Sequence, residues 1–442
     1  MKKLLFAILI IALALPVFAE GGQEADAETF DIVWLGSGGL SFPDTETFRE
    51  FDTVDEYNRA KFIEANPNVT SIEFIYRGTN TGSQVFDMMR AAGAPPAIYM
   101  DATGYFDRLL IPEYAIPLEK YLDLSRYTKS IMDIYNRDGH QYAIPTNNVA
   151  VAMVINLDLL EKAGIEIPPE DEWQEQWTTD NFLVIAEALK QIGIPATAIQ
   201  VKEGLNGWTC FWIYAFGGKF FDPADWSKTA LNSPEAYEAL EYIKLLVDKG
   251  YAMPNAFAYC DDEAVVDFSL EKLFSSAMQN TNIDAVFANR LKTGKIDKVP
   301  NYTFVEFPHS PRLEHAPASG YQTITSGHLS GNETKDKLIA EFIYLNTGPL
   351  YQHYNATKGA FPVMPGIAPD TGMAAWPTYK ALAKVAETAG YYQQWPSGPA
   401  KYAALRPWKR LSDLWIRGKI TTTELLDDYE AEANLALEEF FD

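Results

Sequence analysis

The sequence predicts an α/β protein made of more than one sheet-and-helix unit, and three observations support this prediction. Segments rich in β-forming residues alternate with helical segments over residues 29–100. The same alternation restarts at Val149 and again at Thr323. The length of 442 residues, with 47% hydrophobic and 22% charged residues, suits two to three globular units.

The first block predicts three strands separated by two helices. TFDIVWLG, residues 29–36, alternates as a strand does, and a loop connects it to a helix in DEYNRAKFIEANPNV that stops at Asn66-Pro67. A second strand, TSIEFIYRG, precedes a helix that ends at Gly93, and a buried strand follows at Ala97–Met100. This order predicts a parallel sheet flanked by helices.

Later blocks repeat this pattern. Residues 149–155 predict a strand and residues 157–163 a helix, and a further helix capped by Thr178 or Thr179 leads into a strand in IPATAIQV. Helices are expected at 209–216 and 233–249, and TITSGHLSGNETKDKLIAEFIYLNTG predicts a strand, a loop and a helix. The tail, residues 400–441, predicts helix with an acidic end.

The first residues have the three regions of a secretory signal peptide. Lys2 and Lys3 precede an apolar stretch, residues 4–15, and Val17-Phe18-Ala19 offers a small-residue cleavage pattern. We therefore expect residues 1–19 to be a signal peptide and the mature protein to be periplasmic. No cysteine lies near the cleavage point, so lipid attachment there is not expected. A retained N-terminal anchor is the alternative.

The charge and the cysteines bound the possible partners. The net charge of −24 argues against nucleic acid as a partner, because binding phosphates requires Lys and Arg.

The chain contains only two cysteines, Cys210 and Cys260. They could pair in an oxidising compartment, or they could be two separate thiols with Cys210 buried among aromatic residues. Neither spacing is typical of a zinc or redox motif.

Motifs of catalysis and cofactor binding are missing from the sequence. There is no phosphate-binding P-loop, no G-x-S-x-G nucleophile elbow and no H-E-x-x-H zinc motif. His309, Glu314 and His315 suggest a metal cluster, but the prolines around them favour a solvated loop. We therefore expect no cofactor, no metal and no enzymatic activity.

An ordered set of segments resembles bacterial family 1 solute-binding proteins of ABC importers, the type that includes maltose-binding protein. The matching segments include FIEANPNV, MMRAAGAPPAIYM, DGHQYAIPTNNVAVAMVINLDLLEKAGIEIPP, FWIYAFGGKFFD, GYQTITSGHL and KGAFPVMPG. They cover nearly the whole chain after the leader. The sequence departs from the family at Ala97, where Asp is frequent, and in the added length of GSGGLSFPDTETFREFD.

The resemblance implies a two-lobe periplasmic-binding-protein fold, class II-like, in which each lobe is a sheet flanked by helices and hinge crossovers join the lobes. It places residues 29–146 and 320–352 in an N-terminal lobe and residues 147–319 and 353–442 in a C-terminal lobe. A ligand would bind in the cleft between the lobes, which close on it. Pro145 would fix the chain as it leaves the first lobe.

The resemblance also implies ligand-binding candidates at positions that match cleft-facing segments. Amides, carboxylates and aromatic platforms suit sugars, which present hydroxyl groups and flat C–H faces. The candidates are Ser37, Gly38, Asp101, Tyr105, Asn147, Asn148, Trp208, Asn280, Asn282, Asp284, Tyr321, Gln322, Trp395, Arg406 and Trp408. The alternatives are structural: the amides and Asp101 could cap turns or helices, and a single Trp could belong to the core.

The expected function is that of an exported, monomeric carrier that binds a sugar or oligosaccharide and delivers it to the permease of an ABC importer. Two alternatives remain open at this point. One is a secreted glycoside hydrolase, although no carboxylate motif supports it. The other is a binding protein for a cationic solute such as a polyamine, which Asp101 and Asp284 would neutralise.

Overall fold

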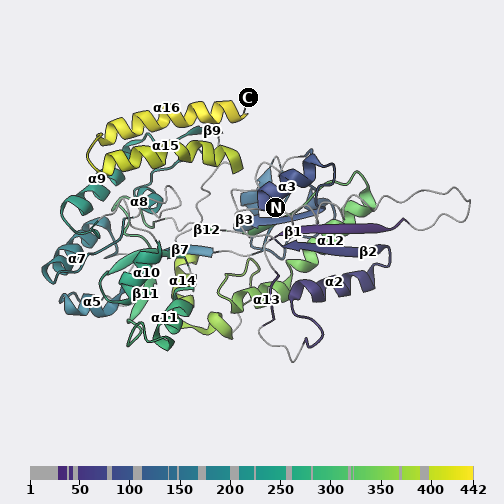
Figure 1. The fold of residues 1–442 in the computed structure, drawn as a ribbon, viewed down its shortest axis with the longest axis horizontal. Coiled ribbons are helices and arrows are strands. Elements are labelled where there is room, and N and C mark those ends of the chain that lie inside the picture. The colour runs from purple at the N-terminus through teal and green to yellow at the C-terminus, as the bar shows by residue number, and fades with distance from the viewer. Residues whose placement is uncertain are drawn as a thin grey trace, which may run out of the picture.

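The computed structural model describes residues 28–36, 39–42, 48–76, 82–102, 112–137, 139–146, 149–167, 176–199, 209–222, 225–254, 261–279, 282–316, 320–321, 323–367, 371–388 and 398–441. Two larger sheets organise these residues, and separate sets of helices cover each sheet (Figure 1). We call the part built on the sheet that contains β1 the first lobe and the part built on β7 the second lobe. The predicted two-lobe α/β fold is therefore confirmed.

The first sheet combines strands from distant parts of the chain. Within the described residues its order is β2 (Val69–Tyr76), β1 (Phe30–Gly36), β3 (Ile98–Ala102), β13 (Thr323–Gly327) and β6 (Ile144–Pro145). β1 pairs in parallel with β2 and β3, as the sequence predicts. β13 is antiparallel to both of its neighbours, so a segment from late in the chain completes the sheet.

Helices cover both faces of the first sheet. Trp34 of β1 packs on Phe342 of α12 (Glu333–Asn346), and Leu35 lies in the opposite cluster with Phe86 of α3 (Gly82–Ala91). α2 (Val54–Ala65) begins with a capping box in which Thr53 and Glu56 satisfy each other's backbone N–H groups. The shorter elements of this lobe are η2 (Leu118–Lys120), α4 (Lys129–Met132), η3 (Asp133–Tyr135), β4 (Asn136–Arg137) and β5 (His140–Gln141).

The added length after β1 forms an aromatic cluster with α2 and α13 (Pro349–Thr357). Phe42 stacks on Phe48 with ring centroids 4.1 Å apart, and the edge of Tyr354 of α13 meets Phe42 at 5.1 Å. Leu40 and Tyr351 complete the buried part of this cluster. The segment therefore packs as part of the first lobe and ties its first strand to α13.

The second sheet is antiparallel and is organised around β7 (Val149–Asn156). β10 (Ser275–Gln279), β11 (Tyr302–Val305) and β12 (Gly320–Tyr321) all pair antiparallel with β7. Side chains of β7 alternate between two cores. Met153 and Ile155 face one large cluster, whereas Ala152 and Val154 face another. β7 is thus buried on both sides, in agreement with its apolar sequence.

The helices of the second lobe come from three stretches of the chain. They are α5 (Leu157–Lys162), α7 (Thr179–Gln191), α8 (Thr209–Ala215), α9 (Pro234–Asp248), α10 (Asp261–Ser269), α11 (Asn282–Lys292), η5 (Gly372–Ala375), α14 (Pro377–Thr388), α15 (Gly398–Ile416) and α16 (Thr422–Phe441). A hairpin of β8 (Phe221–Asp222) and β9 (Asp225–Thr229) contacts α16. The predicted helical tail is therefore two helices, which lie side by side at the top of Figure 1.

The strand predicted in IPATAIQV is wrong for its described part, residues 194–199. Thr197 forms only isolated bridges, to Ala252 and Ser275. Ala196 donates to the carbonyl of Tyr251 in the loop after α9, at 2.7 Å. Because this partner is a loop, the pairing extends over too few residues to make a strand.

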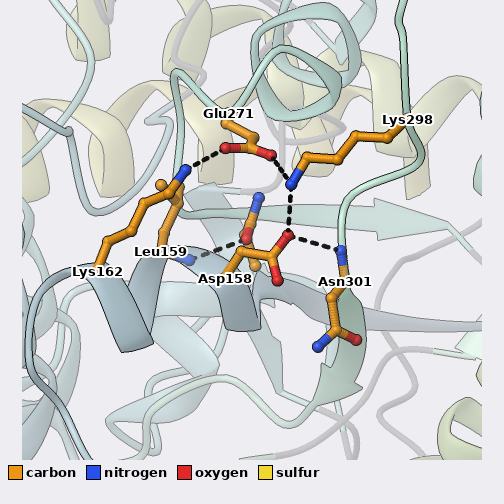
Figure 2. A network of polar contacts seen from close by, with 7 residues as sticks. Asp158, Leu159, Lys162, Glu271, Lys298 and Asn301 are labelled. Carbon is orange, nitrogen blue, oxygen red and sulfur yellow. Dashed lines mark hydrogen bonds and ion pairs between the residues drawn. The ribbon is translucent and has the colours of Figure 1, made fainter.

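An ion network joins three segments of the second lobe. Lys298 contacts Glu271 at 2.8 Å and Asp158 of α5 at 3.1 Å, and Lys162 of α5 also pairs with Glu271 (Figure 2). Hydrogen bonds from both lysines hold the pKa of Glu271 below its ordinary value. The network ties α5 to the turn after α10 and to the loop that ends at Asn301.

Candidate functional site

Strand ends gather at one edge of each sheet. β1, β2 and β3 run in parallel, so their carboxyl ends at Gly36, Tyr76 and Ala102 lie at the same edge. β13 begins and β6 ends at this edge because β13 is antiparallel to both neighbours. In the second sheet, β7 begins where β10 and β11 end. The candidate site lies where these two edges meet.

Two crossovers connect the edges. The first leads from β6 to β7, and the second returns from β12 to β13. In the first lobe Pro145 pairs with Ile324, and in the second lobe Val149 pairs with Tyr321. Pro145 is the last residue of β6 in the first sheet, and Val149 is the first residue of β7 in the second, where the sequence predicts a strand to begin.

The pairing register between the crossovers changes by one residue. On the first-lobe side, the backbone N–H of Thr146 donates to the carbonyl of Thr323 at 2.7 Å. Two residues separate Thr146 from Val149, whereas one residue separates Tyr321 from Thr323. The two crossovers therefore differ by one residue in length between these two pairs.

Asp101 lies at the first edge beside the crossovers. Its backbone pairs with Ile324, which pairs in turn with Pro145, so the three residues form one row across the sheet. The side chain is 3% exposed, and the hydroxyl of Tyr99 donates to its Oδ2 at 2.6 Å. Carboxylate oxygens accept hydrogen bonds, and sugar hydroxyls are donors of the matching kind.

Most of the other predicted site residues lie outside the described residues. These are Ser37, Gly38, Tyr105, Asn147, Asn148, Trp208, Asn280, Gln322 and Trp395. The described residues that directly precede some of them, Gly36, Thr146 and Gln279, lie at the two strand edges. Asn282 begins α11, Asp284 lies within α11, and Tyr321 lies in β12.

The structure does not bring Trp408 to this site. Trp408 is fully buried on α15 and meets Phe220 edge-on at 5.5 Å and Tyr429 of α16 at 5.9 Å. Its position is a correction of the predicted ligand contact, because aromatic neighbours of the second-lobe core enclose the ring. Arg406, two residues earlier on α15, is exposed.

A buried polar group supports the loop behind the ends of β1 and β2. Asp55 is 2% exposed and accepts two hydrogen bonds at 2.8 Å, from the backbone of Leu40 and from the side chain of Asn346. Burial raises the pKa of the Asp55 carboxyl, and the two hydrogen bonds oppose that rise. Burial also lowers the pKa of Lys358, which Asp55 partly offsets. The carboxylate anchors the start of the loop that follows β1.

Sequence reasoning did not find Gln352 of α13. Its amide Nε2 donates to the carbonyl of Thr146 at 2.9 Å, and its Oε1 accepts from the backbone N–H of Val363 at 2.9 Å. Gln352 and Thr146 are 206 positions apart in the chain. No local pattern in PLYQHYNAT indicates such a partner.

Other classes of site receive no support from the described residues. They contain no cluster of three His, Cys, Asp or Glu side chains suited to a metal ion. His315 instead pairs with the buried carboxylate of Glu306 at 3.0 Å. None of the described helices is both long enough and apolar enough to cross a membrane. Cys210 is buried, whereas Cys260 lies outside the described residues.

Solved structures share this architecture over nearly the whole chain. The cyclic α-maltosyl-1,6-maltose binding protein of Arthrobacter globiformis is 14% identical, with a TM-score of 0.70 over 93% of this chain and 100% of the other. The sugar-binding protein MalE of Xanthomonas citri is also 14% identical, with a TM-score of 0.70 over 93% of this chain and 98% of the other. At this identity the similarity establishes the fold.

Sequence comparisons place the chain in a family. A protein of Brucella abortus (strain 2308), described as a binding protein without a stated ligand, is 25% identical over 229 residues. The match covers 50% of this chain and 51% of that protein, so the chain spans about half the length of the curated relatives it matches. The profile described as "Bacterial extracellular solute-binding protein" matches residues 45–309. The chain belongs to this family of bacterial extracellular solute-binding proteins.

Proposed function

We propose that this protein binds a sugar or oligosaccharide between its two lobes and delivers it to the permease of an ABC importer, without catalysing a reaction. The observation that carries the proposal is the pair of crossovers, which places the edges of two separate sheets beside each other. Such an arrangement lets two rigid bodies close on a ligand about a hinge. The solved structures of similar fold whose names specify a sugar support the choice of ligand class.

Asp101 is the described residue that we propose to contact the ligand. It is buried at the edge of the first sheet, in the same row as Pro145. We propose that other residues from both lobes supply its partners: Ser37, Gly38, Tyr105, Asn147, Asn148, Trp208, Asn280, Asn282, Asp284, Tyr321, Gln322 and Trp395, with Arg406 at the rim. Amide and carboxylate groups would bind hydroxyls, and the aromatic rings would stack on sugar faces.

The proposal includes export and a division of the chain between the lobes. Residues 1–19 would be a signal peptide cleaved near Ala19, and the mature protein would act as a periplasmic monomer. The sequence-based division puts residues 29–146 and 320–352 in the N-terminal lobe and residues 147–319 and 353–442 in the C-terminal lobe. Two of its boundaries move, because Gly320–Tyr321 pair with β7 of the second sheet and because Tyr354 and Val363 pack in the first lobe. The packing of Val363 in the first-lobe core and of Phe361 in the second-lobe core favours a third crossover near these two residues.

The first test is to identify what the protein retains. The full chain, purified without denaturation, is analysed by native mass spectrometry and then titrated with a panel of maltose, maltotetraose, chitobiose and arabinotriose. We expect at least one saccharide to bind with micromolar or tighter affinity. Spermidine is included in the panel, and release of reducing ends from polysaccharides is assayed. Binding of spermidine alone, or hydrolysis, would refute the proposal.

Asp101 offers a paired test of the site. Asp101→Asn removes the charge beside the crossovers, and we expect it to weaken saccharide binding by about 10-fold to 100-fold, because hydrogen bonds to charged groups contribute about 1.5–3 kcal/mol. Asp31→Asn is the matched control. Asp31 lies near the amino end of β1, where Thr70 and Ser71 bind its carboxylate. Equal affinities of both variants would exclude Asp101 from the site.

A further inference from the structure

Within the described residues, the side chain of Gln352 joins two of the connections between the lobes. Thr146, whose carbonyl it binds, is the last described residue of the first crossover on the first-lobe side. Val363, whose N–H it accepts, lies in the connection from α13 to α14. Phe361 of this connection packs in a second-lobe cluster, whereas Val363 packs in the first-lobe core. Thr146 therefore lies where the chain leaves the first lobe, and Val363 lies where it re-enters the first-lobe core after Phe361.

The amide is fully used in these contacts. Gln352 is 1% exposed, and its Nε2 also donates to the carbonyl of Thr347 at 3.3 Å. Two N–H donors and one oxygen acceptor therefore all have partners. All three partners are backbone groups, and Asn355 adds a donor to the carbonyl of Thr146 at 3.3 Å. Only a carboxamide of this length supplies both a donor and an acceptor at this position.

The register step between the crossovers begins directly beyond this contact. The paired ladder continues to Thr146 and Thr323, and the change of register lies between them and the pair formed by Val149 and Tyr321. We propose that Gln352 is a positioning residue that fixes the first-lobe ends of two connections, at Thr146 and at Val363, and so restricts the orientations that the two lobes can adopt. This inference rests on the proposed function, in which the lobes close on a ligand.

The test measures the orientation of the lobes in the ligand-free protein. Spin labels are attached to p-acetylphenylalanine at positions 337 on α12 and 292 on α11, which carry exposed lysines and lie in different lobes. This chemistry leaves both cysteines unchanged. Gln352→Met keeps the length of the side chain and removes both hydrogen-bonding groups. We expect the fraction of molecules whose distance between the two spin labels lies outside the wild-type range to rise roughly fivefold. Loss of about one net hydrogen bond changes an equilibrium by about this factor.

Gln141→Met is the matched control. Gln141 is 7% exposed, and its Nε2 donates to the carbonyl of Ala143 at 2.7 Å within the first lobe. This variant loses a comparable buried hydrogen bond but does not touch the third connection. We expect its distance distribution to match that of the wild type. A broadening equal to that of Gln352→Met, or no broadening in either variant, would overturn the proposal.

Gln352→Glu provides a readout that a purely structural role would not change. Its carboxylate can accept from Val363 but cannot donate to Thr146 until it is protonated. We expect the distance distribution to narrow as pH falls from 8 to 5, while that of the wild type stays constant. A pH-independent distribution would contradict the proposal, even if Gln352→Met failed to fold. Because no ligand is added, a negative saccharide titration would refute the proposed function and leave this test unaffected.

Discussion

Substitution of Glu271 separates backbone strain from ion pairing in a single residue. Glu271 follows α10 with φ of +54°, and it is the one non-glycine residue with positive φ in the described part of the chain. The N–H of Lys272 donates to Asp267 and the N–H of Glu271 to Phe268, which is the hydrogen-bond pattern of a Schellman motif. Glycine occupies the equivalent position after α9, at Gly250, where φ is +69°.

The two contributions of Glu271 can be estimated separately. A left-handed conformation costs a non-glycine residue about 1 kcal/mol relative to glycine. The pairs with Lys162 and Lys298 contribute about 0.2–1 kcal/mol each, because both lysines are more than half exposed and solvent screens their charge. Glu271→Ala keeps the strain and loses the pairs, so we expect the free energy of unfolding to fall by about 1 kcal/mol. Glu271→Gly should recover about that amount.

Urea unfolding followed by circular dichroism measures these differences at low and high salt. The loss in Glu271→Ala should shrink in 1 M NaCl, because salt screens exposed pairs, whereas the gain from Ala to Gly should not change. The two lysines lower the pKa of Glu271, so its stabilisation is present above its ordinary pKa and is lost as pH falls through the lowered value. Equal stability of the Ala and Gly variants would refute the strain argument.

Three further predictions concern buried groups. Burial raises the pKa of Asp55, so the folded state binds the proton more tightly, and the free energy of unfolding falls as pH rises from about 4 through the raised value. Asp55→Asn should reduce this fall in urea titrations at pH 4–8. An unchanged dependence of the unfolding free energy on pH would contradict the prediction. A Cβ on Gly327 would lie 2.8 Å from the side chain of Ile339 on α12, so Gly327→Ala should lower the free energy of unfolding in urea by about 1–3 kcal/mol. A variant as stable as the wild type would contradict this prediction, because it would mean that α12 moves away without cost. Trp408→Ala should lower the free energy of unfolding by about 3–5 kcal/mol and leave the saccharide affinity measured by calorimetry unchanged. Weaker saccharide binding by this variant would show that Trp408 contributes to the binding site.

The elements that the sequence predicts well are those with local signals. Thr53, Thr178 and Ser233 cap their helices with side-chain oxygens, and the structure begins α2, α7 and α9 directly after them. The first three strands alternate in their own sequence, and they form the expected parallel set. Such signals depend on residues three or four positions apart, which a single sequence displays.

Features that depend on distant partners could not be predicted in this way. Trp408 lies on an amphipathic helix, and its burial depends on Phe220 and Tyr429, which no nearby residue reveals. The role of Gln352 depends on backbone groups in two other connections. The place of Asp101 at the end of its strand was predictable, because TGYFDRL after AIYMDA breaks the strand pattern, and its contact with a ligand stays a prediction.

The order of strands also determines when each lobe can fold during synthesis. β13 lies between β3 and β6, so the first sheet stays divided until residue 327 has been made. Trp415, Tyr429 and Leu437 close the larger core of the second lobe, so this lobe waits for almost the whole chain. A nascent polypeptide that lacks its last two helices therefore has a complete first sheet but leaves the larger core of the second lobe open. Until those helices are made, this lobe exposes apolar side chains that chaperones bind.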